Sequence, residues 1–166
     1  RPKTSFSNIK IYIARFIKVV RTALIFGSSG LIGGHVLNHI IKDKLQQTGK
    51  KMLKVYLAGE IHSNWREEII QLCEKEKLDV KFTSPVTDHE ASDNCGVEIL
   101  GNEEKNFWKD RKGANINSIR TKKSIQDCDV IIVKFGEKYK QWNAAFDAGY
   151  ATALNKSMIV IHNDDH

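Results

Sequence analysis

The stretch from Tyr139 to Ala151 constrains the fold of this 166-residue chain more than any other part of its sequence. It follows an apolar run, Val130 to Val133, that predicts a buried strand, and a turn that contains Gly136. Its small residues allow a helix to pack closely against a sheet; they are Ala144, Ala145, Ala148, Gly149 and Ala151. Its single carboxylate is Asp147. Because open α/β sheets bind ligands beyond the carboxyl ends of parallel strands, Asp147 is a candidate nucleophile or base.

Apolar runs and helical patterns alternate through the rest of the chain. We expect strands at residues 53–57, 80–82, 130–135 and 158–161, and helices at 65–77, 113–125 and 143–154. Residues 87–101 are polar and predict a long loop. Strands that are apolar throughout imply a parallel sheet covered on both faces. The predicted fold class is therefore a three-layer α/β domain of the flavodoxin-like or Rossmann-like kind.

The N-terminal segment reads as an extra βα unit. An apolar strand at 23–26 precedes three glycines, Gly27, Gly30 and Gly33, and then a helical pattern at 36–45. This arrangement resembles the opening of a short-chain dehydrogenase, in which such glycines bring backbone amides close to a pyrophosphate. No second strand with a terminal acid follows, and the Tyr-x-x-x-Lys of those enzymes is missing. We expect a truncated unit at the sheet edge or loosely attached, and no cofactor; an NAD(P) site at the glycines stays open.

Charge separates the N-terminal segment from the remainder. Residues 1–42 carry seven Lys or Arg and no acid. Because the whole chain has a net charge of +6, the remainder has a net charge of −1. We therefore divide the chain into a basic extension, 1–50, and a main domain, 51–166, joined by the polar residues 47–51. The extension, with a predicted helix at 9–20, is either a solvated basic tail or an organelle transit peptide.

Several classes of partner and location are disfavoured by composition. The main domain shows no basic stripe interleaved with aromatics, so we expect no nucleic-acid binding. No apolar run is long enough to span a membrane. The three cysteines, Cys73, Cys95 and Cys128, lack metal-binding spacing and fit a reducing, cytoplasmic location.

The candidate site lies where the ends of the first and third main-domain strands and the 87–101 segment converge. Its candidate polar or aromatic residues are Tyr56, Gly59, Glu60, His62, Asp88, His89, Glu90, Asp93, Gln141, Trp142, Asn143 and Asp147. The Asp88–Asp93 run has ligand types that suit divalent metals. Adjacent residues rarely point at one ion, however, so we favour a substrate-holding loop or a helix cap, and assign no metal.

Two motifs resemble the nucleoside 2-deoxyribosyltransferase superfamily. Tyr56-Leu57-Ala58-Gly59 resembles its opening motif, and the segment from Ala145 to Ala151 resembles its Ala-x-Glu-x-Gly-x-Ala signature. Longer stretches, residues 56–66, 85–93 and 135–150, resemble the YtoQ family, a branch of the same fold. The resemblance covers about residues 52–163 and leaves out the first fifty.

The resemblance implies an activity and roles for individual residues. It places Asp147 at the nucleophile that forms a glycosyl-enzyme, and Tyr56 as the group that orients this carboxylate. Trp65 or Trp142 would stack on a base, and the protein would be a homo-oligomer. The family's Glu, substrate-binding Asp and Gly-Thr pair are replaced by Asp147, Gln141 and Asn143-Ala144.

Three functions therefore remain open. The first is an N-glycosidase or deoxyribosyltransferase, a hydrolase or transferase acting on a nucleoside or nucleotide. The second is a non-catalytic module that binds a nucleotide or sugar nucleotide, which the replaced residues favour. The third is an NAD(P)-binding protein that uses the N-terminal glycines.

Overall fold

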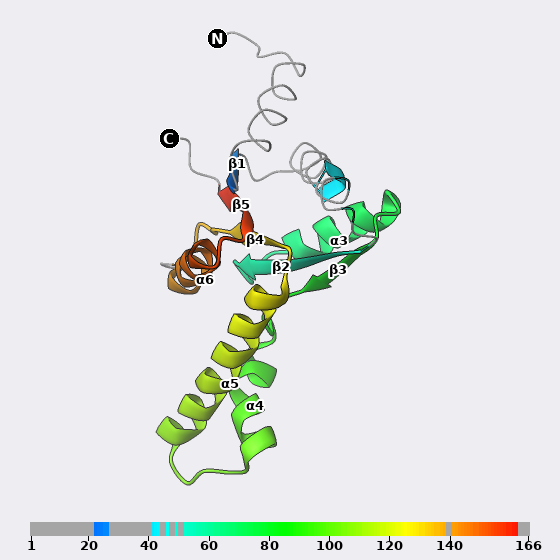
Figure 1. Ribbon diagram of the computed structural model, residues 1–166. Coiled ribbons are helices and arrows are strands. Elements are labelled where there is room, and N and C mark those ends of the chain that lie inside the picture. Colours follow the sequence, from blue (N-terminus) through cyan, green and yellow to red (C-terminus); the bar gives the residue numbers. More distant parts are fainter. Residues whose placement is uncertain are drawn as a thin grey trace.

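The computed structural model describes residues 22–26, 41–43, 46, 49, 52–138 and 141–162 (Figure 1). Its elements are β1 (Thr22–Phe26), β2 (Leu53–Gly59), α3 (Trp65–Lys75), β3 (Val80–Thr83), α4 (His89–Leu100), α5 (Asn106–Asp127), β4 (Val130–Lys134), α6 (Trp142–Ala153) and β5 (Ser157–His162). Every strand expected from the sequence is present, and the α/β class is confirmed. The predicted helix at 9–20, the glycine turn and most of the pattern at 36–45 lie outside the described residues.

The five strands form one parallel sheet in the order β1-β5-β4-β2-β3. From β2 onward, the strands follow the flavodoxin-like order, in which the first lies between the second and the third. β1 extends this sheet by pairing with β5, from Thr22 opposite Met158 to Phe26 opposite His162. The N-terminal strand therefore joins the sheet edge, which was one of the two expected positions.

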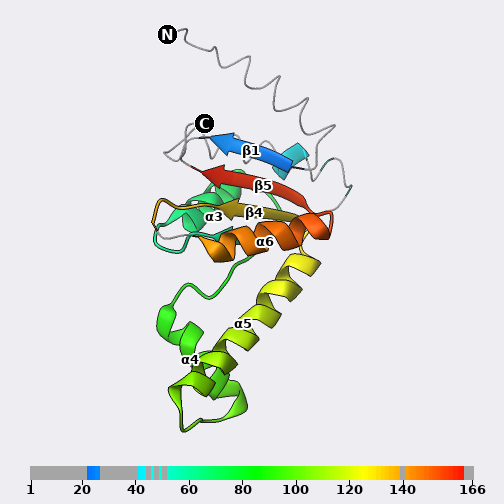
Figure 2. The same cartoon turned by 90° about the vertical axis from the view of Figure 1, so that its left-hand side faces the viewer.

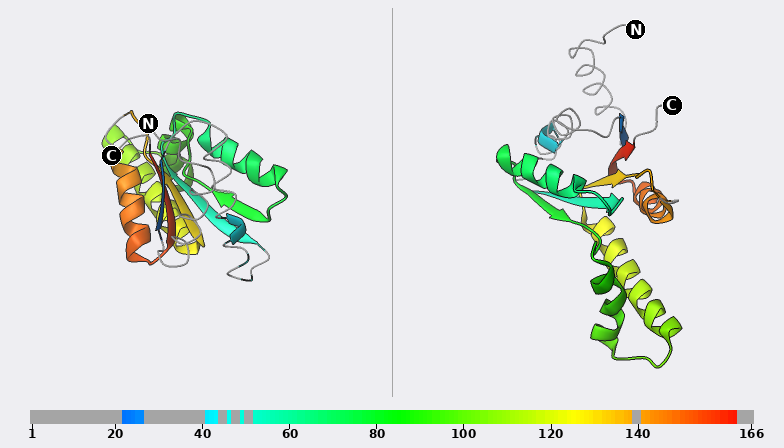
Figure 3. Two further views of the ribbon diagram at one scale, coloured as in Figure 1. Left: turned by 90° about the horizontal axis from the view of Figure 1, so that it is seen from above. Right: turned by 180° about the vertical axis from the view of Figure 1, so that it is seen from behind.

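Side chains from both faces of the sheet are buried, which explains why its strands are apolar throughout. Leu53, Val55 and Leu57 of β2 pack with α3 on one face. Tyr56 and Ala58, the alternate residues of the same strand, pack with α5 and α6 on the other. Figure 2 and the left view of Figure 3 show α3 and α6 on opposite sides of the sheet.

The expected small-residue face of α6 is only partly correct. Ala144 and Ala151 are buried against the sheet, and Ala148 is half-buried. Ala145 and Gly149 are exposed, and a methyl group at Gly149 would touch nothing within 4 Å. Three small residues, rather than five, therefore allow the close approach of this helix.

The segment between β3 and β4 differs most from the expectation. The predicted polar loop at 87–101 is wrong, because α4 begins at His89 after Asp88, whose carboxylate accepts a hydrogen bond from the Ala91 amide (2.7 Å). The helix expected at 113–125 begins instead at Asn106. The two helices form a hairpin that projects from the body, here called the arm (Figure 1).

Glycines allow the two helices of the arm to approach closely. A Cβ atom at Gly96 would lie 2.4 Å from the Gly113 nitrogen. The polar composition of α4 hid this helix, because its stability comes from packing on α5 rather than from an apolar stripe facing the sheet.

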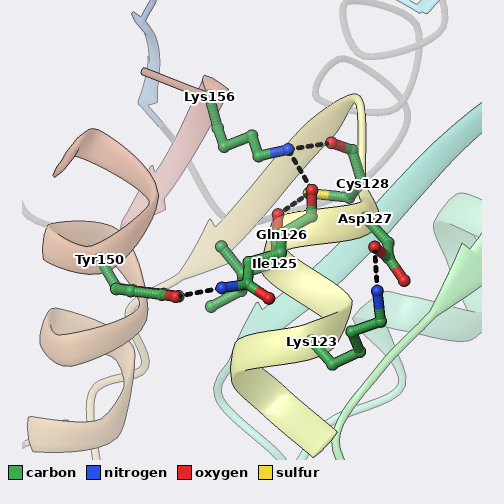
Figure 4. A network of polar contacts seen from close by, with 7 residues as sticks. All are labelled: Lys123, Ile125, Gln126, Asp127, Cys128, Tyr150 and Lys156. Carbon is green, nitrogen blue, oxygen red and sulfur yellow. Dashed lines mark hydrogen bonds and ion pairs between the residues drawn. The ribbon is translucent and has the colours of Figure 1, made fainter. Parts of the chain in front are cut away.

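A polar network fixes the base of the arm to the body (Figure 4). The Gln126 side-chain amide donates to the Tyr150 hydroxyl of α6 (2.9 Å). The Lys156 ammonium, immediately before β5, donates to the carbonyls of Gln126 (2.5 Å) and Cys128 (2.8 Å). A cation at carbonyls that have no helical donor stabilises the C-terminus of α5.

None of the helices in the described part of the chain combines the length and apolar character that crossing a bilayer requires. Ile41, the first described residue after β1, is fully buried in the core cluster that β2, α3, β4 and β5 form. The division at residue 50 stays a prediction.

Replacement of Gly59 by Ala should destabilise the protein by about 2–4 kcal/mol. Gly59 has φ +97° at the end of β2, and a Cβ atom there would lie 2.1 Å from the Lys134 carbonyl oxygen. Gly149→Ala is the matched control and should be neutral or stabilise by up to about 1 kcal/mol, since it lies open in a helix. Urea unfolding followed by circular dichroism measures both; equal losses would contradict the steric account.

Candidate functional site

A cavity of about 730 Å³ lies at the carboxyl ends of β2 and β3. Its walls come from four regions: the end of β2, the segment after β3, the arm and the first half of α6. Its lining residues are Tyr56, Gly59, Ile61, Ser84, Pro85, Val86, Ser92, Asp93, Asp110, Gly113, Ala114, Asn117, Ser118, Arg120, Thr121, Ser124, Asn143, Phe146 and Asp147. The volume falls within the range of small-molecule sites, about 300–1,000 Å³.

Asp147 is a buried carboxylate that lines this cavity. It lies on α6 with 5% of its surface exposed. It forms no hydrogen bond or ion pair with another residue that the structure describes, and burial raises its pKa to about 6. Buried polar groups almost always have partners, so an unpaired one in a ligand-sized cavity marks a functional site.

Tyr56 lies beside this carboxylate, on the face of β2 that packs with α5 and α6. Its hydroxyl donates to the Thr121 hydroxyl of α5 (3.4 Å). Burial, with a smaller contribution from the charge of Asp147, raises the pKa of Tyr56 to about 12 against the effect of the Thr121 hydrogen bond. The phenol is therefore protonated at neutral pH and able to donate.

Arg66 holds the chain at the end of β2. Its buried guanidinium donates to the carbonyls of Leu57 (3.2 Å), Gly59 (3.0 Å) and Glu60 (2.6 Å). The Trp65 indole donates to the same Glu60 carbonyl (2.8 Å). Trp65 is only 5% exposed and packs in the α3 core, so the expectation that it stacks on a ligand is wrong.

The Glu60 carboxylate is engaged by its own loop. Burial raises its pKa, but donation from the Ser63 hydroxyl (2.5 Å) and the His62 amide outweighs burial and lowers it. A methyl group at Gly136 would collide with the Glu60 side chain, which shows how tightly the loop after β4 covers it. Neither Glu60 nor His62 lines the cavity.

The structure brings together some of the predicted residues and separates the others. Tyr56, Gly59, Asp93, Asn143 and Asp147 line the cavity, whereas seven candidates do not: Glu60, His62, Trp65, Glu90, Asp88, Gln141 and Trp142. The His89 side chain lies outside the described part of the structure.

Asp88, Gln141 and Trp142 lie outside the cavity for different reasons. Asp88 caps α4. Gln141 precedes α6 in a left-handed conformation, φ 50°, and its amide donates to the Lys138 carbonyl (2.5 Å). Trp142 points into solvent with 73% of its surface exposed.

One wall of the cavity was missed by sequence reasoning. Residues of α5 at helical spacing, Gly113, Asn117, Thr121 and Ser124, line it together with Arg120. Their three-and-four spacing was a usable signal, but their small polar side chains suggested solvent rather than a site. Phe146 was also missed; it is half exposed at the cavity and stacks on Tyr150, with ring centroids 6.2 Å apart.

Metal binding finds no support in the described part of the chain, where no three His, Cys, Asp or Glu residues are grouped to hold an ion. The cavity carries Asp93, Asp110 and Asp147 against one cation, Arg120. Its lining is therefore net acidic and rich in hydroxyl and amide groups. Such a lining suits a ligand with many hydroxyl or amino groups.

A parallel sheet with a ligand-sized cavity beyond its strand ends, and an unpaired carboxylate in that cavity, is typical of small-molecule-binding α/β domains. A family model described as Nucleoside 2-deoxyribosyltransferase YtoQ matches residues 56–166, and the chain belongs to this family. The Uncharacterized protein YtoQ of Bacillus subtilis (strain 168) is 50% identical over 107 residues, which cover 64% of this chain and 72% of that protein. All the residues that line the cavity lie within the family match.

Asp147→Asn should stabilise the protein at neutral pH. The folded-state pKa of about 6 lies above the ordinary 3.8, so the native state prefers the protonated carboxyl. The stability that the protonated Asp147 carboxyl contributes to the folded state is complete below about pH 4 and is lost as the pH rises through 6. Above pH 6 the charge costs on the order of 1–3 kcal/mol, which the amide removes.

Urea unfolding at pH 4 and pH 7.5 measures this difference. Asp147→Asn should gain stability over the parent at pH 7.5 and little at pH 4. Asp110→Asn, a change at an exposed carboxylate of the same cavity, is the control and should show no such dependence. A loss of stability in Asp147→Asn at pH 7.5 would show that the folded protein compensates the burial of the ionised carboxylate.

Proposed function

We propose that this protein breaks the N-glycosidic bond of a nucleoside or nucleotide, with Asp147 as the nucleophile. The observation that carries the proposal is the buried, unpaired carboxylate in a cavity of about 730 Å³. Membership of a family named for nucleoside 2-deoxyribosyl transfer supports the same class of substrate.

The reaction proceeds in two displacements. An Asp147 oxygen attacks the anomeric carbon, and the carbon–nitrogen bond breaks with its electron pair leaving on the base, which takes a proton from solvent. Water, or the nitrogen of a second base, then attacks the anomeric carbon and releases the carboxylate. Two inversions give net retention. Hydrolysis or transfer results, depending on the acceptor.

Neighbouring side chains supply positioning. The protonated Tyr56 phenol donates to Thr121 in the free protein, and rotation about its C–O bond turns the same proton toward the Asp147 carboxylate and holds it for attack. The exposed ring of Phe146 offers a face for the base, and Asn143 offers an amide to the sugar. The net acidic lining favours an uncharged nucleoside over a phosphorylated one.

Binding without turnover is the second candidate, and one observation favours it. Gln141 stands where the transferases carry a substrate-binding Asp, yet its amide is turned to the Lys138 carbonyl. Asp147 is also one methylene shorter than the family's Glu. For both candidate functions we also propose a cytoplasmic location and a homo-oligomeric state.

Incubation with a panel of nucleosides and their 5′-monophosphates, with base release followed by chromatography, tests the first candidate. The parent should release base, and Asp147→Asn should lose at least about 10³-fold in kcat. Asp127→Asn, a surface change on α5 remote from the cavity lining, should keep full activity. Base release by Asp147→Asn at the parental rate would remove the proposed nucleophile. Calorimetric binding without base release would establish the second candidate instead.

The pH dependence of base release gives an independent check. The nucleophile must be ionised, so kcat/KM should fall about tenfold per pH unit below the Asp147 pKa of about 6. A profile that stays flat down to pH 4.5 would show that no group with this pKa takes part.

A further inference from the structure

The cavity extends from the carboxylate of Asp147 outward along the arm. Its lining follows α5 from Thr121, whose hydroxyl lies 3.4 Å from that of Tyr56, to Asp110. At about 1.5 Å per residue, these two positions on α5 lie roughly 16 Å apart along the helix. Figure 1 shows α5 running outward from the body. The cavity therefore has a reacting end, at Asp147, and a distal end, on the arm.

The distal end of the cavity is acidic. Asp110 lies there on α5, and Asp93 lies on α4 at the level of Gly113, since a Cβ atom at Gly113 would be 3.0 Å from the Asp93 carbonyl oxygen. Gly113 is about 12 Å from Thr121 along α5. Within the described part of the chain, neither carboxylate forms a hydrogen bond or an ion pair. Two carboxylates that no cation neutralises attract a positively charged group.

The one cation among the lining residues lies nearer the reacting end. Arg120 directly precedes Thr121 and is exposed to the cavity. Its guanidinium forms no ion pair with Asp93 or with any other residue that the structure describes. An unpaired guanidinium can bind a carboxylate through two parallel hydrogen bonds. Negative and positive groups therefore line the cavity at separate positions, which suits a zwitterionic ligand.

Exposed charges alone would not define a site, because most surface charges are simply solvated. These three, however, line the same cavity as Asp147, which is 5% exposed and has no partner among the described residues. A buried carboxylate at one end and unpaired charges toward the other share one volume of about 730 Å³. This arrangement indicates a single ligand that spans both ends.

We propose that the substrate is a nucleoside whose 5′ position carries an amino-acid substituent. Its glycosidic bond lies at Asp147, its ammonium group at Asp93 and Asp110, and its carboxylate at Arg120. Such a nucleoside has no net charge, in keeping with a lining that disfavours phosphate. The inference rests on the proposed function for the orientation of the nucleoside, but its distal contacts are tested by binding alone.

Isothermal titration calorimetry at pH 7.5 compares two pairs of ligands that differ in the substituent. S-Adenosylhomocysteine carries the amino acid that 5′-methylthioadenosine lacks. 5′-Alanylamino-5′-deoxythymidine carries an ammonium group, and 5′-acetylamino-5′-deoxythymidine carries no charge. In at least one pair, the charged ligand should bind at least about tenfold more tightly, because charge-assisted hydrogen bonds are strong. Equal affinities within each pair, or no binding of any of the four at 1 mM, would overturn the proposal.

Variants assign the preference to individual side chains. Asp93→Asn/Asp110→Asn should reduce it to less than about threefold without changing the affinity for the uncharged ligand. Glu98→Gln/Glu104→Gln removes two exposed acids of the arm that do not line the cavity, and this matched control should keep the full preference. Arg120→Gln should weaken S-adenosylhomocysteine and leave the alanylamino ligand unaffected, because only the former has a carboxylate. A full preference in the Asp93/Asp110 variant, with an unchanged circular dichroism spectrum, would overturn the distal site.

Failure of this inference differs from failure of the proposed chemistry. Asp147→Asn should keep the binding preference, because the change lies at the reacting end, while it loses base release. A preference for the charged ligand without base release by the parent would support the distal site and remove the chemistry. Base release from nucleosides with no preference for a charged substituent would support the chemistry and overturn the distal site.

Discussion

The structure depends on the close approach of backbone at the end of β2. Gly59 adopts φ +97° directly against the Lys134 carbonyl, and only a residue without Cβ fits there. The Arg66 guanidinium donates to three carbonyls at the same strand end, those of Leu57, Gly59 and Glu60. Because these contacts set the path of the chain leaving β2, they also place Tyr56 and the cavity beside it.

The cavity lowers the stability of the folded protein, because it holds a buried carboxylate. A carboxylate buried with no described partner is destabilising when ionised, and its raised pKa expresses that cost. The apolar cores on the two faces of the sheet stabilise the fold against this cost. A ligand that supplies a positive centre or a hydrogen-bond donor to Asp147 would offset the cost, which links binding to the stability of the site.

The arm gives the domain two separate surfaces. Its inner side supplies one wall of the cavity, through the polar residues of α5. Its outer side carries exposed Trp108 and Ile119. The Gln126 and Lys156 contacts fix the angle at which α5 leaves the body, so the wall and the outer surface are positioned together.

Local patterns were enough to predict the strands, α3 and α6, and that Tyr56 and Asp147 line one site. Apolar runs indicate buried strands, and the carboxyl ends of parallel strands meet at one edge of the sheet. The extent of α5, the existence of α4 and the burial of Trp65 depend on contacts between segments distant in sequence. Polar helices that pack on each other leave no apolar stripe, and an indole beside a turn has the same local pattern whether it faces a ligand or a core. These features could therefore be known only once the chain was folded.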